Sequence, residues 1–260
     1  MNDMQLKKLR QKGLILMGVC DIIAIIAFII FFAVGSNIEL SILSFVILVL
    51  ALLGRMYLKK KFITPYEQNQ NTKIYENHNM QICYDNYLKK NFYIAEKEIY
   101  KLKIYNNYNR LVFDTKYLIL DKTNNVVIQE VIINYEKSNG KKTSTHELFN
   151  GKIYKFYFKD FKPNQLIIKH GIIDEQEMIV ETKEFNEFKY SILANCNEAL
   201  RLKDEKMIEE ILSIDEKLTL SFTNNYLYIL KSNDSKEKKN IVDKIDQEKL
   251  FIESILKLIK

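Results

Sequence analysis

Histidines, cysteines and glycine-rich loops are where catalytic or metal-binding chemistry would first be sought in this sequence. The three histidines, His78, His146 and His170, have no Cys, Asp or Glu at a spacing typical of metal ligands, and no HExxH pattern occurs. No GxSxG nucleophile motif or phosphate-binding glycine loop is present either. The sequence therefore predicts no catalytic residue, no metal site and no cofactor, and it leaves open a site assembled only by the fold.

One carboxylate is exceptional because of its surroundings. Asp21 is the only ionisable side chain between Gly13 and Val34, and an ionisable residue in such a segment is a functional-site hypothesis that needs a partner. Arg55 is the candidate, because side chains tilt toward the N-terminus of their own helix, which makes the two lean toward each other across a helical hairpin. We expect this intramembrane polar pair to be structural or to serve an interaction. An ion or proton path, which would need several copies of the chain, is the alternative.

Two apolar runs must position this pair. At about 1.5 Å per residue, the helices expected at about 13–34 and 38–58 each span roughly 30 Å, the thickness of a bilayer core. A polar turn, 35–37, separates them, so residues 1–61 are predicted to form a transmembrane hairpin. A cleaved signal peptide is disfavoured, because the first run is too long and a second follows at once. Small residues, Gly18 and Ala24 with Ser44, Ala51 and Gly54, are predicted to line the helix contact.

Basic residues flank both predicted helices, whereas the turn between the helices has none. The topology-setting flanks are Lys7, Lys8, Arg10, Lys12, Lys59, Lys60 and Lys61. By the positive-inside rule both termini are cytoplasmic, which predicts a two-pass protein of the plasma membrane with residues 62–260 in the cytosol. Three scattered cysteines without a CxxC pair agree with that compartment.

The net charge of +6 is concentrated near the N-terminus. Residues 1–61 contain eight basic and three acidic side chains, which leaves +1 for residues 62–260. A nucleic-acid-binding domain would concentrate basic residues on its own surface, so no nucleic acid is expected as a partner. The expected partners are the lipid bilayer and either another membrane protein or a second copy of the chain.

Residues 62–260 are predicted to form one α+β domain, a mainly antiparallel β domain with a few helices. Strands are indicated at 82–84, 111–120, 126–136, 143–158 and 165–171, because these segments are rich in β-branched and aromatic residues. Hairpin turns are indicated at Asn124-Asn125, at Ser138-Asn139-Gly140 and at Asn224-Asn225 between LTLSF and YLYIL. Gly151 is a candidate β-bulge, and residues 188–202 are ambiguous between strand and helix.

Helices are predicted in three places in this domain. Residues 95–102 form a short one, and another follows Asp204, a good N-cap, with Met207, Ile208, Ile211 and Leu212 on its apolar face. The C-terminal segment 247–260 is amphipathic, with Phe251, Ile255, Leu258 and Ile259 directed inward. Packing on the domain is favoured for it, and lying on the membrane surface is the alternative.

Two blocks of the chain resemble a known family. These are THELFNGKIYKFYFKDF at 145–161 and the longer block 184–229, which ends in a hairpin from Leu220 to Ile229. Together with Glu130-Val131, Phe149-Asn150-Gly151 and the residues Phe185, Phe188 and Tyr190, they resemble the bacterial domain-of-unknown-function 3137 family. The resemblance covers most of residues 70–260 and implies a membrane-anchored bacterial protein. It carries over no catalytic residue, because none is established in that family.

Three functional hypotheses remain at this stage. The leading one is a non-enzymatic, membrane-anchored interaction or ligand-binding module at the inner face of the membrane. The second is a membrane-tethered enzyme whose site is assembled only in three dimensions. The third is a subunit of a multi-pass membrane complex that uses Asp21.

Overall fold

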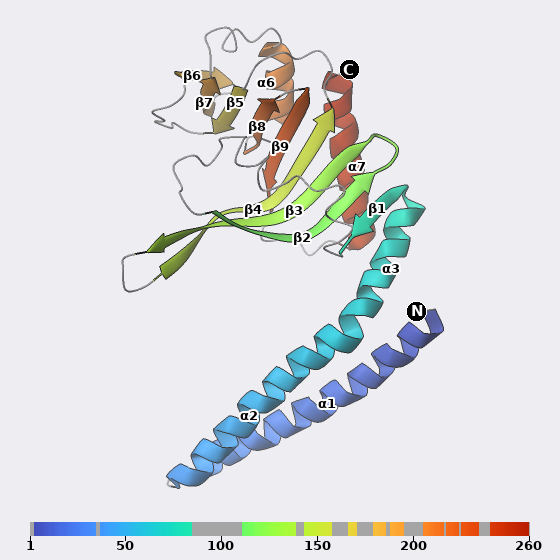
Figure 1. The fold of residues 1–260 in the computed structure, drawn as a ribbon, viewed down its shortest axis with the longest axis vertical. Coiled ribbons are helices and arrows are strands. Elements are labelled where there is room, and N and C mark those ends of the chain that lie inside the picture. The colour runs from blue at the N-terminus through green and yellow to red at the C-terminus, as the bar shows by residue number, and fades with distance from the viewer. Residues whose placement is uncertain are drawn as a thin grey trace. The chain divides into compact units, whose positions relative to one another are not determined.

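The computed structural model consists of two compact units, Met1–Lys73 and Ile74–Lys260, which are described separately. The residues that the structure describes are 3–34, 37–84, 111–138, 143–157, 166–170, 179–185, 188–194, 205–215, 217–223, 225–233 and 240–259. The predictions at 95–102, Asn139-Gly140, 195–202 and Asp204 lie outside them. Both units are shown in Figure 1.

The first unit is a pair of long apolar helices. Helix α1 spans Asp3–Ala33, and α2 spans Ile38–Leu58 with Asn37 as its N-cap. The second helix continues without a break through a π-helical turn, η1 (Lys59–Ile63), into α3 (Thr64–Asn77). Two helices long and apolar enough to cross a membrane are therefore present.

The boundaries of the first unit differ from those expected. Helix α1 begins at Asp3, so the basic flank that precedes the apolar run is itself helical. The unit ends at Lys73 and not at residue 61, because α3 carries the second helix onward. Contacts of Asp3 with Asn69 and Lys73 join the start of α1 to α3, with Asn69 Nδ2 donating to Asp3 Oδ1 at 2.8 Å.

Small residues make the contact between α1 and α2, although not all of those predicted. Ala27, Ser44 and Ala51 are buried. Gly18 is not part of the contact, since a Cβ added there would meet nothing within 4 Å. The closest approach is at Gly13, where an added Cβ would lie 2.5 Å from Phe62 Cβ of η1. Most large apolar side chains of both helices are exposed, as they are in helices that face lipid.

The second unit is built on one antiparallel sheet. Among the described residues nine strands follow the order β1-β2-β3-β4-β9-β8-β5-β7-β6 (Figure 1). The strands are β1 (Met80–Cys83), β2 (Leu111–Asp121), β3 (Val126–Ser138), β4 (Thr143–Tyr157), β5 (Leu166–His170), β6 (Ile179–Phe185), β7 (Phe188–Ala194), β8 (Thr219–Thr223) and β9 (Tyr226–Ser232). All pairings between the described strands are antiparallel. The prediction of an α+β chain with a mainly antiparallel sheet is confirmed.

Asparagines close the hairpin turns in the way that the sequence indicated. Asn125 and Asn225 adopt φ of 56° and 69°, a left-handed conformation that asparagine tolerates well. The first of these turns is also held by Asp121, whose carboxylate accepts hydrogen bonds from the backbone N–H groups of Thr123 and Asn124. The β2–β3 and β8–β9 hairpins are therefore fixed by local sequence.

The expected bulge at Gly151 is absent from the described register, where Gly151 pairs regularly with Val131 and Ser232. The register shift lies nearby, between the pairs Ile133–Phe149 and Asn134–Glu147. Glycine is needed at 151 for another reason. A Cβ there would lie 2.2 Å from the carbonyl oxygen of Lys231, so the close approach of β9 excludes a side chain.

Two helices cover one face of the sheet. Helix α6 (Glu205–Ile214) buries Ile208, Ile211 and Leu212, as predicted. Helix α7 (Ile241–Ile259) begins earlier than expected, where the Asn240 side chain accepts a hydrogen bond from the N–H of Val242. Phe251 and Ile255 are buried in the main core, so α7 packs on the sheet domain.

Candidate functional site

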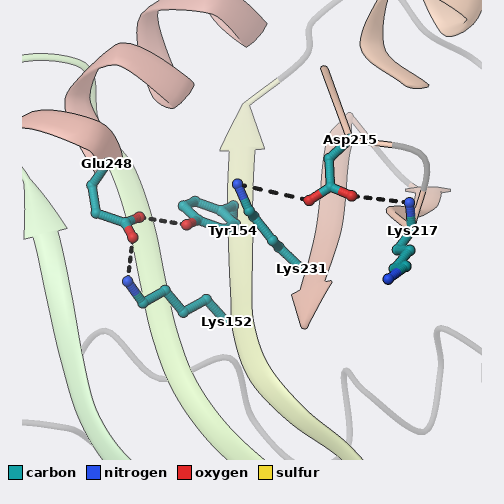
Figure 2. Close-up of polar contacts among 6 residues, drawn as sticks. All are labelled: Lys152, Tyr154, Asp215, Lys217, Lys231 and Glu248. Atoms are coloured by element: carbon teal, nitrogen blue, oxygen red, sulfur yellow. Dashed lines mark hydrogen bonds and ion pairs between the residues drawn. The ribbon is translucent and has the colours of Figure 1, made fainter. Parts of the chain in front are cut away.

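A buried carboxylate of α7 lies over the centre of the sheet. Glu248 is on the same helix face as the buried Ile245, Ile252 and Ile255, at spacings of three, four and seven residues. Its Oε2 accepts a hydrogen bond from the hydroxyl of Tyr154, and its Oε1 pairs with the ammonium of Lys152 (Figure 2). Both partners come from β4, so a single carboxylate ties α7 to that strand.

A second carboxylate, Glu130, stands on the neighbouring strand β3, directly opposite Lys152 in the strand register. Lys116 Nζ lies 3.3 Å from Glu130 Oε1, and the hydroxyl of Tyr117 is hydrogen-bonded to the same carboxylate. Adjacent residues of a regular strand point to opposite faces, but β2 has a bulge between Thr115 and Tyr117. The bulge allows both Lys116 and Tyr117 to contact Glu130.

The tyrosines beside these carboxylates are held in their neutral form. Burial raises the pKa of Tyr154 well above its ordinary value, and the charge of Glu248 raises it further. Burial likewise raises the pKa of Tyr117, with Glu130 as the next cause. Both hydroxyls therefore remain hydrogen-bond donors at neutral pH.

The ammonium group of Lys231, on β9, is also at this site. Its Nζ lies 3.8 Å from Asp215 Oδ2, which is longer than a hydrogen bond (Figure 2). The same Nζ lies 4.7 Å from the ring centroid of Phe251. Asp215 is oriented by a second contact, since its other oxygen accepts a hydrogen bond from the backbone N–H of Lys217 at 3.0 Å. The ammonium group of Lys231 is thus attracted to Asp215 by charge but does not form a hydrogen bond with it.

These side chains surround a cleft of about 610 Å³ between α7 and the sheet. Its charged lining consists of Glu130, Glu248, Lys152, Lys231 and Lys244. The uncharged polar lining consists of Tyr117, Tyr154, Ser232, Asn233, Gln247 and Ser254. The volume lies within the range of small-molecule sites, about 300–1,000 Å³.

The chemistry of this lining favours binding. Each carboxylate is already engaged by one lysine and one tyrosine hydroxyl, so neither is available as an open metal ligand. No group of three or more His, Cys, Asp or Glu residues suited to a metal ion occurs within the described ranges. The cleft presents hydrogen-bond donors and positive charge to an incoming molecule.

The sequence-predicted polar pair lies in the other unit. Arg55 Nε is 3.1 Å from Asp21 Oδ1, so the two side chains meet between α1 and α2. Their role stays a prediction. Of the predicted basic flank, Lys7, Lys8, Arg10 and Lys12 lie on α1, and Lys59, Lys60 and Lys61 lie on η1. Arg10 stacks over the ring of Tyr66, with its Cζ 4.8 Å from the ring centroid.

His78, His146 and the described cysteines do not converge on a site, and the side chain of His170 lies outside the described part of the chain. His78 Nδ1 contacts the carbonyl of Ile74 at 2.8 Å, and the ring of His146 stacks on Tyr135. Cys83 is buried, Cys20 is half-buried on α1, and neither forms a disulfide. Glu147 lies opposite Asn134 on the part of β4 beyond the bulge, so it is not paired with Glu130.

Sequence reasoning missed the residues that line the cleft. Glu248 carried a signal, because a carboxylate between Ile245 and Ile252 interrupts the apolar face of α7. The signal from Lys152 and Tyr154 was weak, since the alternation of a strand places the two residues on one face but does not say what that face meets. No sequence signal marked Lys231, Lys244 and Asp215, because these residues come together only through the packing of β9, α6 and α7.

Comparison with known proteins gave one partial similarity. The crystal structure of the mycobacterial trehalose monomycolate transport factor A, TtfA, aligns with a TM-score of 0.39 and 10% sequence identity, over 74% of this chain and 93% of that chain. Neither a protein-family model nor a curated protein matches the chain. The resemblance to the domain-of-unknown-function 3137 family stays a prediction.

Proposed function

We propose that this protein is a non-enzymatic interaction or ligand-binding module anchored at the inner face of a bacterial plasma membrane. The observation that carries the proposal is the combination of a long apolar helix pair with a sheet domain that has a polar cleft of about 610 Å³. Anchoring the module in a bilayer raises its effective concentration for membrane partners. No nucleic acid is needed to explain its charge, which is concentrated around the helix pair.

The proposed topology is two-pass, with both termini in the cytoplasm. The basic flanks at both cytoplasmic ends and a turn without basic residues support it. It is tested with single cysteines in a background in which Cys20, Cys83 and Cys196 are replaced by alanine. In intact cells a membrane-impermeant maleimide should label Asn37→Cys, whereas Lys257→Cys should react only after the membrane is permeabilised. Labelling of Lys257→Cys in intact cells would contradict the topology.

Asp21 and Arg55 are proposed to lock the helix pair and so to permit a partner to bind beside it. Charges that are 3.1 Å apart attract strongly where water is scarce. Native mass spectrometry of the particle purified in mild detergent, with wild type and Asp21→Leu compared, tests this role. A partner or second copy lost from Asp21→Leu supports an interaction through the bilayer, which is the complex-subunit hypothesis. Identical particles of unchanged stability would remove any role for Asp21.

One observation favours the enzyme hypothesis as a second candidate. Glu130 and Glu248 line the same cleft, and two carboxyl groups in one cleft can act as general acid and general base. The compensation of each carboxylate by a lysine weighs against it. The test is whether the wild type turns over a substrate and whether Glu130→Gln abolishes this activity while Glu147→Gln retains it. That result would establish an enzyme and would contradict a non-enzymatic binding module.

A further inference from the structure

The cleft between α7 and the sheet has an excess of positive charge. Its lining contains three lysines and two glutamates. Including the groups that pair with them from outside the lining, Lys116 and Asp215, leaves the excess at one positive charge. A charge that is partly withdrawn from water attracts an ion of opposite sign more strongly than the same charge does at an open surface. Lys231, whose side chain is 35% exposed, is in this position.

The deep end of the cleft is closed to cations. Glu248 is bound by Lys152 and Tyr154, and Glu130 by Lys116 and Tyr117. Side-chain exposures of 11% for Glu248 and 13% for Glu130 show that little of either carboxylate reaches solvent. A cation would have to displace an ammonium group from each, whereas an anion meets donors that are already in place.

Lys231 and Lys244 supply the available positive charge from two different elements. Lys231 Nζ is 3.8 Å from Asp215 and keeps its hydrogen-bonding protons for a ligand. Lys244, in the first turn of α7, has no ion-pair partner among the described residues. The hydroxyl and amide groups of Ser232, Asn233, Gln247 and Ser254 lie along the same cleft. Ser254 Oγ donates to the carbonyl of Leu250 and Asn233 Nδ2 donates to Asn150 Oδ1, but their oxygen atoms have lone pairs that can accept hydrogen bonds from the hydroxyl groups of a ligand.

We propose that the cleft binds a small organic anion that carries several hydroxyl groups, such as a sugar acid or a sugar phosphate, with Lys231 and Lys244 holding its anionic group. The inference rests on the proposed function, because it names the ligand class of that binding module. A lysine ammonium recognises carboxylate and phosphate alike as a point charge. The two lysines come from different elements that border the cleft, Lys231 from β9 and Lys244 from α7.

The experiment is calorimetric titration of the full-length protein in mild detergent with four probes: D-glucuronate, D-glucose 6-phosphate, D-glucose and D-glucosamine. At least one anion should bind at least about tenfold more tightly than glucose, and more weakly as salt is added. Glucosamine should bind no better than glucose. Preference for glucuronate identifies a carboxylate ligand, and preference for glucose 6-phosphate a phosphate ligand.

Variants test the two lysines. Lys244→Gln and Lys231→Gln should each weaken the anion by about tenfold while leaving glucose unchanged, since each removes one charged hydrogen bond. Lys257→Gln is the matched control, because it removes the same charge from the last turn of α7 outside the cleft. The inference is overturned if Lys244→Gln and Lys257→Gln have equal effects on anion binding. It is also overturned if glucose and the anions bind with equal affinity, or if neither anion binds at millimolar concentration. The labelling and mass-spectrometry tests of anchoring and partner binding are independent of these titrations, so this inference can fail while the membrane module stands.

Discussion

At the scale of single residues, Glu248 illustrates how a buried charge is tolerated in this sheet domain. The carboxylate is surrounded by the apolar face of α7, and it is stabilised there by one ammonium and one hydroxyl group of β4. The side chains of Lys152 and Glu248 are 16% and 11% exposed, so removal of either one leaves the other charged and nearly dry. A buried ion pair of this kind is costly to break although it adds little net stability over an apolar pair.

The first prediction concerns this pair. Glu248→Gln keeps the shape of the side chain and removes its charge, so it should lower the free energy of unfolding by about 3 kcal/mol. Thermal unfolding in detergent measures the change, with Glu253→Gln as a control on the exposed face of the same helix. The double variant Lys152→Met with Glu248→Leu should recover much of the loss, because it leaves no unpaired charge. If Glu248→Gln and the control Glu253→Gln have the same unfolding temperature, the pair of Glu248 with Lys152 does not stabilise the fold.

The second prediction concerns alkaline pH. Burial raises the pKa values of Tyr75, Tyr117 and Tyr154 above that of an unfolded tyrosine, about 10. A raised pKa in the folded state means that the folded protein retains protons that the unfolded chain releases. The stabilisation is complete below about pH 10 and is lost as the pH rises further, by about 1.4 kcal/mol per pH unit for each such tyrosine.

Tyr154→Phe should therefore reduce the loss of stability above about pH 10 by roughly one third, since two of the three buried tyrosines remain. Unfolding temperatures measured across the alkaline range give the slope. Tyr157→Phe is the control, because Tyr157 is 54% exposed on the same strand. If the unfolding temperature of Tyr154→Phe falls with alkaline pH as steeply as that of the control, the ionisation of Tyr154 does not contribute to the loss of stability.

At the scale of elements, the π-helical turn η1 and the first helix pack through a glycine. Gly13 of α1 leaves no room for a Cβ, since Phe62 Cβ of η1 would lie only 2.5 Å away. One backbone is therefore in direct contact with a side chain of the other element. Helices in apolar surroundings depend on such close contacts, because burial of apolar surface against lipid gives no driving force.

The third prediction follows from this contact. Gly13→Ala should lower the stability of the helix pair by about 1–3 kcal/mol, because either η1 or α1 has to move. Gly18→Ala is a matched control on the same helix, where the added methyl group meets nothing within 4 Å. It should be neutral or stabilising by up to about 1 kcal/mol, since alanine is the better helix former. Apparent melting temperatures in detergent distinguish the two, and equal effects would contradict the contact.

At the scale of the whole molecule, the chain is two units with separate cores. Both apolar clusters of the sheet domain are composed of residues from Tyr75 onward. Among the residues that the structure describes, no buried member of either cluster comes from Met1–Lys73. Each unit has its own source of stability, namely apolar burial in the sheet domain and close helix packing in an apolar environment for the pair.

The fourth prediction is that residues 74–260 fold without the helix pair. The fragment should be soluble, unfold cooperatively and remain in the supernatant when membranes are sedimented, because every described buried residue of its two apolar clusters lies at Tyr75 or later in the chain. Circular dichroism and sedimentation after expression without residues 1–73 provide the measurement. A fragment that aggregates or lacks cooperative unfolding would show that the sheet domain depends on the first unit.

The sequence alone determined the features that depend on neighbours along the chain. The helix pair follows from the lengths of two apolar runs, and the β2–β3 and β8–β9 hairpins follow from asparagines that tolerate a left-handed backbone. The meeting of Asp21 with Arg55 was also within reach, because a hairpin with a short turn fixes the relative depth of its two helices. The apolar faces of α6 and α7 were readable for the same reason, since a helix repeats every 3.6 residues.

Only the tertiary structure decided where the cleft lies and which groups line it. Tyr117, Glu130, Lys152, Lys231 and Glu248 come from β2, β3, β4, β9 and α7, and they meet because β9 pairs with β4 and α7 crosses the same face. The bulge that brings Lys116 and Tyr117 to one carboxylate, and the close approach of β9 that requires Gly151, likewise depend on the partner strand. Local sequence fixes the periodicity of helices and strands and the positions of turns. Strand order and helix packing depend instead on the burial of apolar surface from distant parts of the chain. The charged residues of the cleft are brought together by that packing.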